Sequence, residues 1–292
     1  MPDQCQYREA VTPLDQMFGA VLLCPPEHFE VKDVKNPHMD LSCPVDAFLA
    51  LQQWDNLRRK FQELGMGVQI IDPIPELEDL VFTNNQVFVG FNSSGDGFVI
   101  PSRMRYESRQ REVPHVVQWF RERQYQIIDL SFDVGGFLEG HGDLLWHCDM
   151  KRVWAGYGIR STYSGIARFS ETIRPMGVAI IPLQLTDPHF YHLDTCLAPL
   201  NAEAVLIYRE AFSLASYASI KASVPRVHEI GRDEALGFMC NGTAIRGHYL
   251  ASRLTPRLED ILGEEGLEPF PVECTEFEKS GGSVCCLKLL ID

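Results

Sequence analysis

The sequence predicts a mixed α/β fold in a single domain that spans residues 1–292, and three observations lead to this prediction. Short runs of β-branched and aromatic residues recur along the chain, and amphipathic segments of helical periodicity lie between them. No linker rich in Pro, Gly or Ser separates two halves. With 292 residues, of which 45% are hydrophobic and 23% charged, the chain can bury a proper core, which excludes the disordered and fibrous classes.

The elements follow one another in a recurring order of two strands, a helix and a strand. Strands are predicted at residues 20–23, 68–71, 86–91, 97–100, 126–130, 144–147, 152–155, 177–183, 204–208 and 284–291. Helices are predicted at 45–64, 108–123, 163–173, 210–223, 232–239 and 257–263. The polar residues 92–97 have the turn chemistry of a hairpin loop. No repeat of fixed length is visible, but this order suits a structural repeat whose sequence has diverged.

Charge and hydropathy exclude several classes of partner. The formal net charge of −14 opposes binding to nucleic acids and suits a cationic small-molecule substrate. No apolar run approaches the ~20 residues that a membrane span needs. The first ten residues lack the basic and apolar segments of an export signal. We therefore predict a cytosolic protein with no nucleic-acid or membrane partner; its oligomeric state is not indicated.

The nine cysteines are scattered without a C-x-x-C pair, which predicts free thiols and no structural zinc site. Cys285 and Cys286 are adjacent, on the strand predicted at 284–291. Neighbouring Cα atoms lie about 3.8 Å apart, whereas a relaxed disulfide needs roughly 5.5 Å, so these two do not easily bridge. Since strand side chains alternate, we expect one thiol to face a site and the other the interior. Packing as two small hydrophobic residues is the alternative interpretation.

Three polar segments interrupt the apolar runs. Residues 79–86 end a strand in consecutive carboxamides, although an ordinary turn would explain them equally well. Residues 137–143 hold Glu139 beside glycines that allow a close backbone approach to a ligand. In residues 190–196, a spacing of two places His192 and Asp194 on one face of a predicted strand, as a general acid/base and its orienting carboxylate require.

Two arginines complete the set of candidate residues. Arg160 follows an aromatic and glycine-rich segment that is expected to be buried, so it needs a carboxylate partner, and Arg109 lies in the helix predicted at 108–123. A thiol, a base, acceptors and two cations suit covalent catalysis on a small zwitterion. A metal hydrolase is disfavoured because His189 and His192 lack a third ligand at a recognisable spacing, and no metal or cofactor is predicted.

In chain order, these segments resemble those of the guanidino-group-modifying hydrolases, the superfamily of arginine deiminases, dimethylarginine dimethylaminohydrolases and amidinotransferases. The matching motifs are Phe-Thr-x-Asn at 82–85, Glu-Gly-x-Gly-Asp at 139–143, His-Leu-Asp-Thr at 192–195 and Gly-Gly-x-x-Cys at 281–285. Within the superfamily, the similarity is greatest to the arginine dihydrolases, through residues 24–29, 154–158 and 191–196. The resemblance covers nearly the whole chain.

This resemblance implies a pentein-type fold, a propeller of five α/β units with pseudo-fivefold symmetry and a central active site. It implies that Cys285 is the nucleophile that attacks the guanidinium carbon, with Cys286 as the alternative. His192 would protonate the leaving ammonia and then activate water. Asp194 would bind a guanidinium nitrogen and support the imidazole, and Glu139 would bind another face of the guanidinium.

The same resemblance implies that Arg109 and Arg160 hold the α-carboxylate of the substrate. Two residues depart from the dihydrolase pattern, because Asn84 and His141 stand where small residues are usual. Both are therefore expected to reshape the pocket.

Asn85 distinguishes members of the superfamily, because deiminases have an aspartate there. A carboxylate suits a guanidinium cation, whereas a carboxamide can donate to the carbonyl oxygen of a neutral ureido group. We therefore predict an arginine dihydrolase that converts L-arginine through citrulline to ornithine, carbon dioxide and two ammonia. An arginine deiminase or a dimethylarginine dimethylaminohydrolase that stops at citrulline is the first alternative. A non-catalytic arginine-binding protein on the same fold is the alternative from another class.

Overall fold

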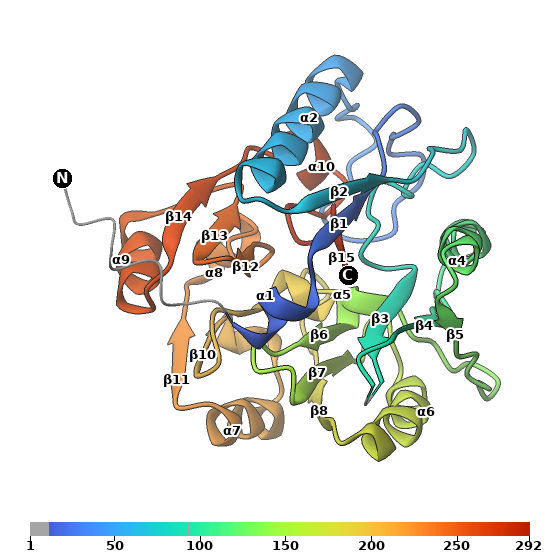
Figure 1. The fold of residues 1–292 in the computed structure, drawn as a ribbon. Coiled ribbons are helices and arrows are strands. Elements are labelled where there is room, and N and C mark those ends of the chain that lie inside the picture. Colours follow the sequence, from blue (N-terminus) through green and yellow to red (C-terminus); the bar gives the residue numbers. More distant parts are fainter. Residues whose placement is uncertain (1–11, 93) are drawn as a thin grey trace.

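The computed structural model describes residues 12–92 and 94–292, and within them the strands form five three-stranded sheets around a central axis (Figure 1). In each sheet the first two strands are antiparallel, and the third is parallel to the middle one. The sheets comprise β3 (Val87–Phe91), β4 (Gly97–Pro101) and β5 (Gln126–Ile127); β6 (Leu144–Trp146), β7 (Arg152–Tyr157) and β8 (Ala179–Gln184); β9 (Leu197–Pro199), β10 (Ala204–Ile207) and β11 (Arg226–Glu229); β12 (Thr243–Ile245), β13 (His248–Ala251) and β14 (Glu268–Pro271); and β15 (Leu289–Ile291), β1 (Ala20–Leu23) and β2 (Gly67–Ile70). The predicted five units are confirmed.

A helical crossover joins the parallel strands of each unit, as parallel pairing requires. These helices are α2 (Ala47–Glu63), α3 (Glu107–Gln110) with α4 (Val113–Glu122), α6 (Tyr163–Ile173), α7 (Leu214–Ser223) and α9 (Pro256–Glu264). Shorter helices are α1 (Pro13–Met17), α5 (Gly140–Asp143), α8 (Arg232–Leu236) and α10 (Thr275–Glu278), with 3₁₀ turns at Arg174–Met176, Leu193–Thr195 and Arg209–Ala211. The longer helices lie on the outside of the ring, while β6, β12 and β15 lie near its centre (Figure 1).

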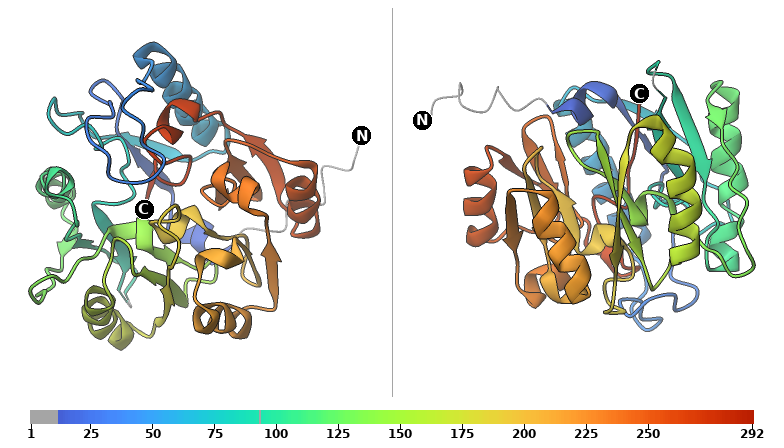
Figure 2. Two further views of the ribbon diagram at one scale, coloured as in Figure 1. Left: turned by 180° about the vertical axis from the view of Figure 1, so that it is seen from behind. Right: turned by 90° about the horizontal axis from the view of Figure 1, so that it is seen from below.

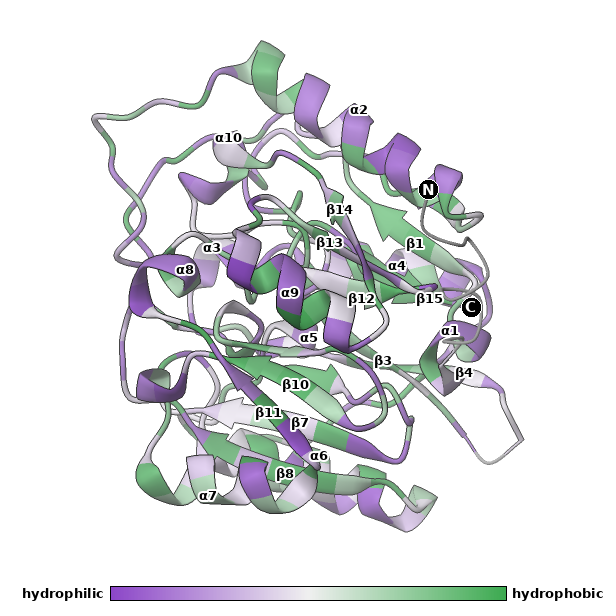
Figure 3. Ribbon diagram, turned by 90° about the vertical axis from the view of Figure 1, so that its left-hand side faces the viewer, coloured by the Kyte–Doolittle hydropathy of each residue, from purple (hydrophilic) through white to green (hydrophobic). Residues whose placement is uncertain are grey.

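Side-chain caps explain where several helices begin. The carboxylate of Asp46 accepts hydrogen bonds from two amides of the first turn of α2, and the hydroxyls of Thr162, Ser213 and Thr255 each accept one at α6, α7 and α9. Helices α2 and α9 are amphipathic and the inner strand β10 is apolar, as their hydropathy colours show (Figure 3). None of the helices in the described part of the chain is both long and apolar enough to span a membrane.

The helix predicted at 108–123 is interrupted in the structure. It splits into α3 and α4 around Arg111 and Glu112, with Pro114 in the first turn of α4. Proline lacks an N–H and its ring clashes with the carbonyl four residues earlier, so a continuous helix is excluded there. The break places Arg109 at the end of a separate short helix.

Strands β9, β11, β12, β13 and β14 were not predicted. β11 and β14 have half-exposed, mostly polar or proline-containing sequences, so neither shows an apolar run. Both are edge strands, where proline and polar residues are tolerated. β9, β12 and β13 are only three or four residues long, which is too short for a clear alternation.

The last predicted strand, 284–291, is wrong in its first half. Only Leu289–Ile291 forms β15, and residues 284–287 form a turn in which the amide of Leu287 donates to the carbonyl of Ser283. The cysteine pair therefore lies on a turn before the strand. All eight cysteines of the described residues are free, as predicted, whereas Cys5 and the predicted absence of an export signal lie outside those residues.

Candidate active site

Two cavities lie on the central axis, toward opposite ends of the ring. The Arg160 cavity is lined by Asp79, Asn85, Arg109, Arg160, Tyr191 and Cys286 together with Lys35, Asn36 and Met39 of the segment between β1 and α2. The Lys288 cavity is lined by Asn84, His141, Cys285 and Lys288 together with Leu14 and Phe18 of the α1 region. Figure 2 (right) shows α1 and the segment between β1 and α2 on opposite faces of the ring.

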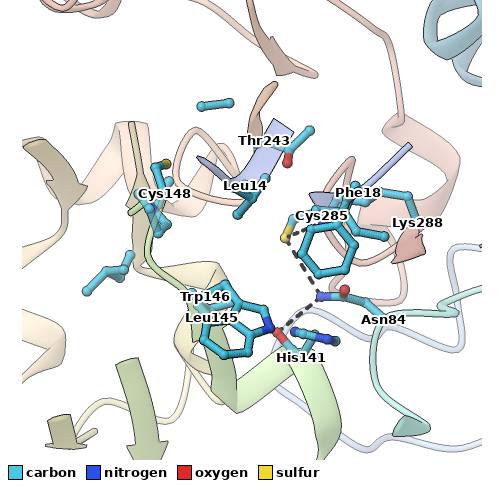
Figure 4. Close-up of a pocket in the computed structure, with 16 residues that line it drawn as sticks. Leu14, Phe18, Asn84, His141, Leu145, Trp146, Cys148, Thr243, Cys285 and Lys288 are labelled. Atoms are coloured by element: carbon cyan, nitrogen blue, oxygen red, sulfur yellow. Dashed lines mark hydrogen bonds between the residues drawn. The ribbon is translucent and has the colours of Figure 1, made fainter. Parts of the chain in front are cut away.

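The two adjacent thiols face different cavities. Cys286 Sγ lies in the Arg160 cavity, 3.2 Å from Asp194 Oδ2. Cys285 Sγ lies in the Lys288 cavity, 3.6 Å from Lys288 Nζ and 3.7 Å from Asn84 Nδ2 (Figure 4). This differs from the prediction that Cys285 faces the site with the two arginines. The adjacent residues Asn84 and Asn85 likewise face different cavities. Asn85 therefore shares a cavity with Cys286 and not with Cys285.

Glu139 joins the candidate base His192 to Arg160. It is fully buried, and its Oε2 lies 2.7 Å from His192 Nε2 and 3.0 Å from Arg160 Nη1, while its Oε1 accepts the amide of Arg105 at 2.8 Å. Burial alone would raise the pKa of Glu139, but Arg160 and His192 hold this pKa well below its usual range. This carboxylate therefore orients the base and one arginine, and its predicted binding to the guanidinium stays a prediction.

His192 and Asp194 do not lie on a strand. The 3₁₀ turn Leu193–Thr195 begins directly after His192 and turns the two side chains apart, and no hydrogen bond joins them within the described residues. Asp194 Oδ2 accepts from Asn84 Nδ2 at 3.3 Å and from the Cys286 thiol. Support of the imidazole by Asp194 is thus a wrong prediction, and Glu139 takes that place.

Both arginines are buried and paired with carboxylates. A carboxylate partner was predicted for Arg160, and in the structure this partner is Glu139. The Arg160 guanidinium also lies over the rings of Tyr106 and Tyr191. Arg109 binds Glu112 through Nε and Nη2 at 3.0 Å each, and its Nη1 donates to Asn85 Oδ1 at 3.2 Å. These pairs hold two guanidinium groups rigidly at the wall of the cavity.

The amide of Asn85 is oriented by its neighbour. Because Arg109 donates to Oδ1, the Nδ2 group turns away from Arg109 toward Gly142, and it has no hydrogen-bond partner among the described residues. A Cβ at residue 142 would lie 2.4 Å from Asn85 Nδ2 and 3.1 Å from the His192 ring, which explains glycine there. The glycines of residues 140–142 thus allow close contact with Asn85 and His192, where a close approach to a ligand was predicted.

Several residues of the site were not singled out from the sequence. Asp143 is buried, and its oxygens accept the amides of Leu193 and Ser161 at 3.0 and 3.2 Å, which fixes the turn that carries His192. Its place at the end of the Glu-Gly-x-Gly-Asp motif was an available signal. Lys35 pairs with Asp33, with Glu78 at 3.2 Å and with Asp79 at 3.0 Å, and no motif indicated it.

The two departures from the dihydrolase pattern lie at the Lys288 cavity. Asn84 and His141 both line it, and neither lines the Arg160 cavity. Neither therefore lines the pocket that holds the arginines, but Asn84 contacts Asp194, so an effect on that pocket stays a prediction. His141 packs against Phe88, with ring centroids 4.7 Å apart.

A family model described as "N,N dimethylarginine dimethylhydrolase, eukaryotic" matches residues 27–291. The chain belongs to this family of guanidino-group hydrolases. The predicted membership of the wider superfamily is thereby confirmed. ArgZ of Synechocystis sp. (strain ATCC 27184 / PCC 6803 / Kazusa), a bifunctional arginine dihydrolase/ornithine cyclodeaminase, is 32% identical over 277 residues. That match covers 93% of this chain but only 37% of ArgZ, so the chain spans little more than a third of that relative.

A dimethylarginine dimethylaminohydrolase of Mycobacterium tuberculosis (strain ATCC 25618 / H37Rv) is also 32% identical, over 92% of this chain and 84% of its own length. The solved N-terminal domain of ArgZ, a cysteine-to-serine variant bound to substrate, matches with a TM-score of 0.85 at 29% identity, over 93% of this chain and 97% of that one. The pentein fold is therefore confirmed, whereas the extent of the single domain stays a prediction.

Burial dominates the electrostatics of the remaining groups in the site. It raises the pKa of Asp194 to about 7, against the lowering effects of the Cys286 contact and of Lys288. It raises the pKa of Asp143 to about 6, and that of the Cys286 thiol well above its ordinary value, with a further rise from Asp194. Among these protein groups the Cys286 sulfur is thus a neutral thiol at neutral pH, and a thiolate requires a cation beside it.

The raised pKa of Asp194 has a measurable effect on stability. Between the unfolded pKa of about 4 and the folded value, the folded state holds a proton that the unfolded state lacks. The free energy of unfolding should therefore fall as pH rises from 5 to 7, with Asp194 contributing up to about 1.4 kcal/mol per pH unit. Urea unfolding of wild type and Asp194→Asn at several pH values measures the difference. Parallel curves for the two proteins would contradict this electrostatic assignment.

Proposed function

We propose that the chain is an arginine dihydrolase that acts twice on the same carbon. In the first hydrolysis L-arginine and water give citrulline and ammonia. In the second, citrulline and water give ornithine, carbon dioxide and a second ammonia. The supporting observation is a pair of buried polar atoms without partners among the described residues: the donor Asn85 Nδ2 and the acceptor Asp194 Oδ1.

This donor and acceptor suit a ureido group better than a guanidinium. A guanidinium carries only N–H donors, whereas a ureido group adds one carbonyl oxygen that accepts hydrogen bonds. Asn85 Nδ2 can donate to that oxygen, and Asp194 Oδ1 can accept from an N–H. Arg109 keeps Asn85 in this orientation by occupying Oδ1. Citrulline can therefore be retained for the second hydrolysis.

We assign the nucleophile to Cys286 instead of Cys285. Cys286 Sγ shares a cavity with Asn85 and both arginines, and its nearest carboxylate oxygen, Asp194 Oδ2 at 3.2 Å, is placed to accept the thiol proton. The cationic guanidinium then stabilises the thiolate, which attacks the guanidinium carbon and forms a C–S bond. His192 protonates the departing ammonia as the C–N bond breaks, while Glu139 holds its ring. His192 next removes a proton from the attacking water, which displaces the sulfur, breaks the C–S bond and regenerates the thiol.

The relatives also support this assignment. The ArgZ and AgrE proteins are named as arginine dihydrolases, and AgrE of Nostoc sp. (strain PCC 7120 / SAG 25.82 / UTEX 2576) has been solved as a cysteine-to-alanine variant with L-arginine. A variant of the ArgZ domain with serine in place of an asparagine is covalently bound to a reaction intermediate. An asparagine and a cysteine are thus already linked to the chemistry of these relatives. We propose that the arginines Arg109 and Arg160 bind the substrate carboxylate.

A dimethylarginine dimethylaminohydrolase is the second candidate, because the Mycobacterium relative with that name is as similar as ArgZ is. Such an enzyme would accept methylated arginine and stop at citrulline. A non-catalytic arginine-binding protein would release no ammonia from any of these compounds.

An end-point assay separates the three functions. Purified protein is incubated with arginine, citrulline or dimethylarginine, and ornithine, citrulline and ammonia are quantified. We expect ornithine and two equivalents of ammonia from arginine. Citrulline without ornithine at long times would contradict the dihydrolase proposal, and no ammonia from any substrate would contradict catalysis altogether.

Asn85→Asp tests the carboxamide directly. A carboxylate at this position opposes the carbonyl oxygen of citrulline, so this variant is expected to accumulate citrulline, with ornithine formation reduced by about 100-fold or more. Asn92→Asp, which changes a carboxamide that lines neither cavity, is the control and should keep ornithine as the product. Undiminished ornithine production by Asn85→Asp would refute this role of Asn85.

A further inference from the structure

The Lys288 cavity takes no part in the proposed reaction, yet it contains an unusual set of polar groups. Its volume is about 60 Å³, and most of its wall is apolar, including Leu14, Phe18, Trp146 and Ala198. Cys285 and Lys288 project into it, and both residues are buried (Figure 4).

Lys288 is a buried cation without an anionic partner. It is 5% exposed, and no carboxylate lies within ion-pair distance of its Nζ in residues 12–92 and 94–292. Its one hydrogen-bond contact there is the sulfur of Cys285 at 3.6 Å, which is a weak acceptor. Burial of an ammonium group is costly unless a negative charge compensates it. An anion bound in the cavity would therefore stabilise the buried charge of Lys288.

The neighbouring polar groups cannot supply that negative charge. Burial raises the pKa of the Cys285 thiol to about 11 despite the opposing effect of Lys288, so the thiol stays neutral at neutral pH. His141 has both ring nitrogens engaged, with Val89 N–H donating to Nε2 and Nδ1 bound to the carbonyl of Leu144. Asn84 and Thr243 also line the cavity, and their oxygens are neutral. Among the described residues of the lining, Lys288 is therefore the one charged group, and it presents a positive charge and N–H donors to a ligand.

We propose that the Lys288 cavity is a binding site for a small aliphatic monocarboxylate. The carboxylate would accept from Lys288 Nζ and the Cys285 thiol, and a short hydrocarbon chain would contact the apolar wall. The volume corresponds to roughly four to six water-sized groups, which accommodates a chain of two or three carbons. A dianion such as phosphate is disfavoured, because a single cation within apolar walls leaves its second charge uncompensated.

Binding is tested by calorimetry on the intact protein with sodium propionate, and with propionamide as a neutral ligand of similar shape. Propionate is expected to bind with a Kd of about 1 mM or tighter, and propionamide at least tenfold more weakly. Propionate should also slow alkylation of Cys285 by iodoacetamide, measured at Cys285 itself by fragmentation mass spectrometry so that Cys286 is scored separately.

Two variants remove the site in independent ways. Lys288→Met removes the charge at similar volume, and Ala244→Leu fills the cavity while the lysine remains. Each should weaken propionate binding at least tenfold, whereas Lys221→Met, at an exposed lysine, should leave it unchanged. Equal affinity for propionamide would overturn the proposal, as would undiminished propionate binding by both folded variants or no binding by wild type. None of these results depends on the enzymatic activity, so failure here is distinguishable from failure of the proposed function.

Discussion

Cys286→Ser should reduce hydrolysis of arginine by more than about 10⁴-fold, because a serine hydroxyl is a far weaker nucleophile than the thiol it replaces. Cys285→Ser should stay within about tenfold of wild type, since its sulfur faces the other cavity and takes no part in the attack. Initial rates of ammonia release measure both variants. Mass spectrometry of acid-quenched reactions should show the covalent adduct on Cys286.

The two substitutions are matched, because both thiols are buried and lie on the same turn. A general loss of folding would lower the melting temperature and affect both variants alike. An inactive Cys285→Ser beside an active Cys286→Ser would return the nucleophile to Cys285. That result would also mean that Asn85 and the two arginines lie away from the reacting carbon.

Glu139→Gln should give the second largest effect, a loss of kcat of about 10³-fold. The substitution removes the charge that holds both His192 Nε2 at 2.7 Å and Arg160 Nη1 at 3.0 Å. The base then loses its orientation, and a buried arginine loses its counter-charge, which costs about 3–5 kcal/mol of stability. Steady-state kinetics with arginine and urea unfolding measure the two consequences separately.

Glu112→Gln is the matched control for this prediction. Glu112 is also a buried carboxylate bound to an arginine, Arg109, but it does not contact His192. This variant should lose stability to a similar extent while KM rises more than kcat falls, because Arg109 is proposed to bind the substrate. An equal loss of kcat in both variants would mean that Glu139 acts only through stability.

The overall architecture could be predicted because it depends on patterns that the sequence displays. The apolar runs at 20–23, 97–100 and 204–208 are buried strands, and the amphipathic segment 163–173 is α6. The family motifs then supplied the fivefold arrangement, which periodicity alone did not reveal. The strands that were not predicted are short or lie at sheet edges. Backbone hydrogen bonds hold such strands in the sheet, so their sequences need no apolar pattern.

The site could be predicted as a set of residues but not as a set of contacts. His192 and Asp194 are two residues apart, and whether their side chains share a face depends on the 3₁₀ turn between them. Asp143 holds this turn by accepting hydrogen bonds from the amides of Leu193 and Ser161. Which thiol faces the arginines depends on the turn at 284–287, and a shift of one residue exchanges the two cavities. Motif spacing does not encode such local backbone rotations.

The fifth sheet has a consequence for how the molecule acquires activity. β15 pairs with β1, so this sheet joins strands that are some 270 residues apart in the chain. Contacts of such long separation carry a high entropic cost and form slowly. Cys286 lies three residues before β15, so the proposed nucleophile reaches the axis only as that sheet closes. A chain that has not yet closed this sheet can hold Glu139 and His192 in folded units and still be inactive toward arginine. Most of the fold can therefore form before the enzyme becomes active.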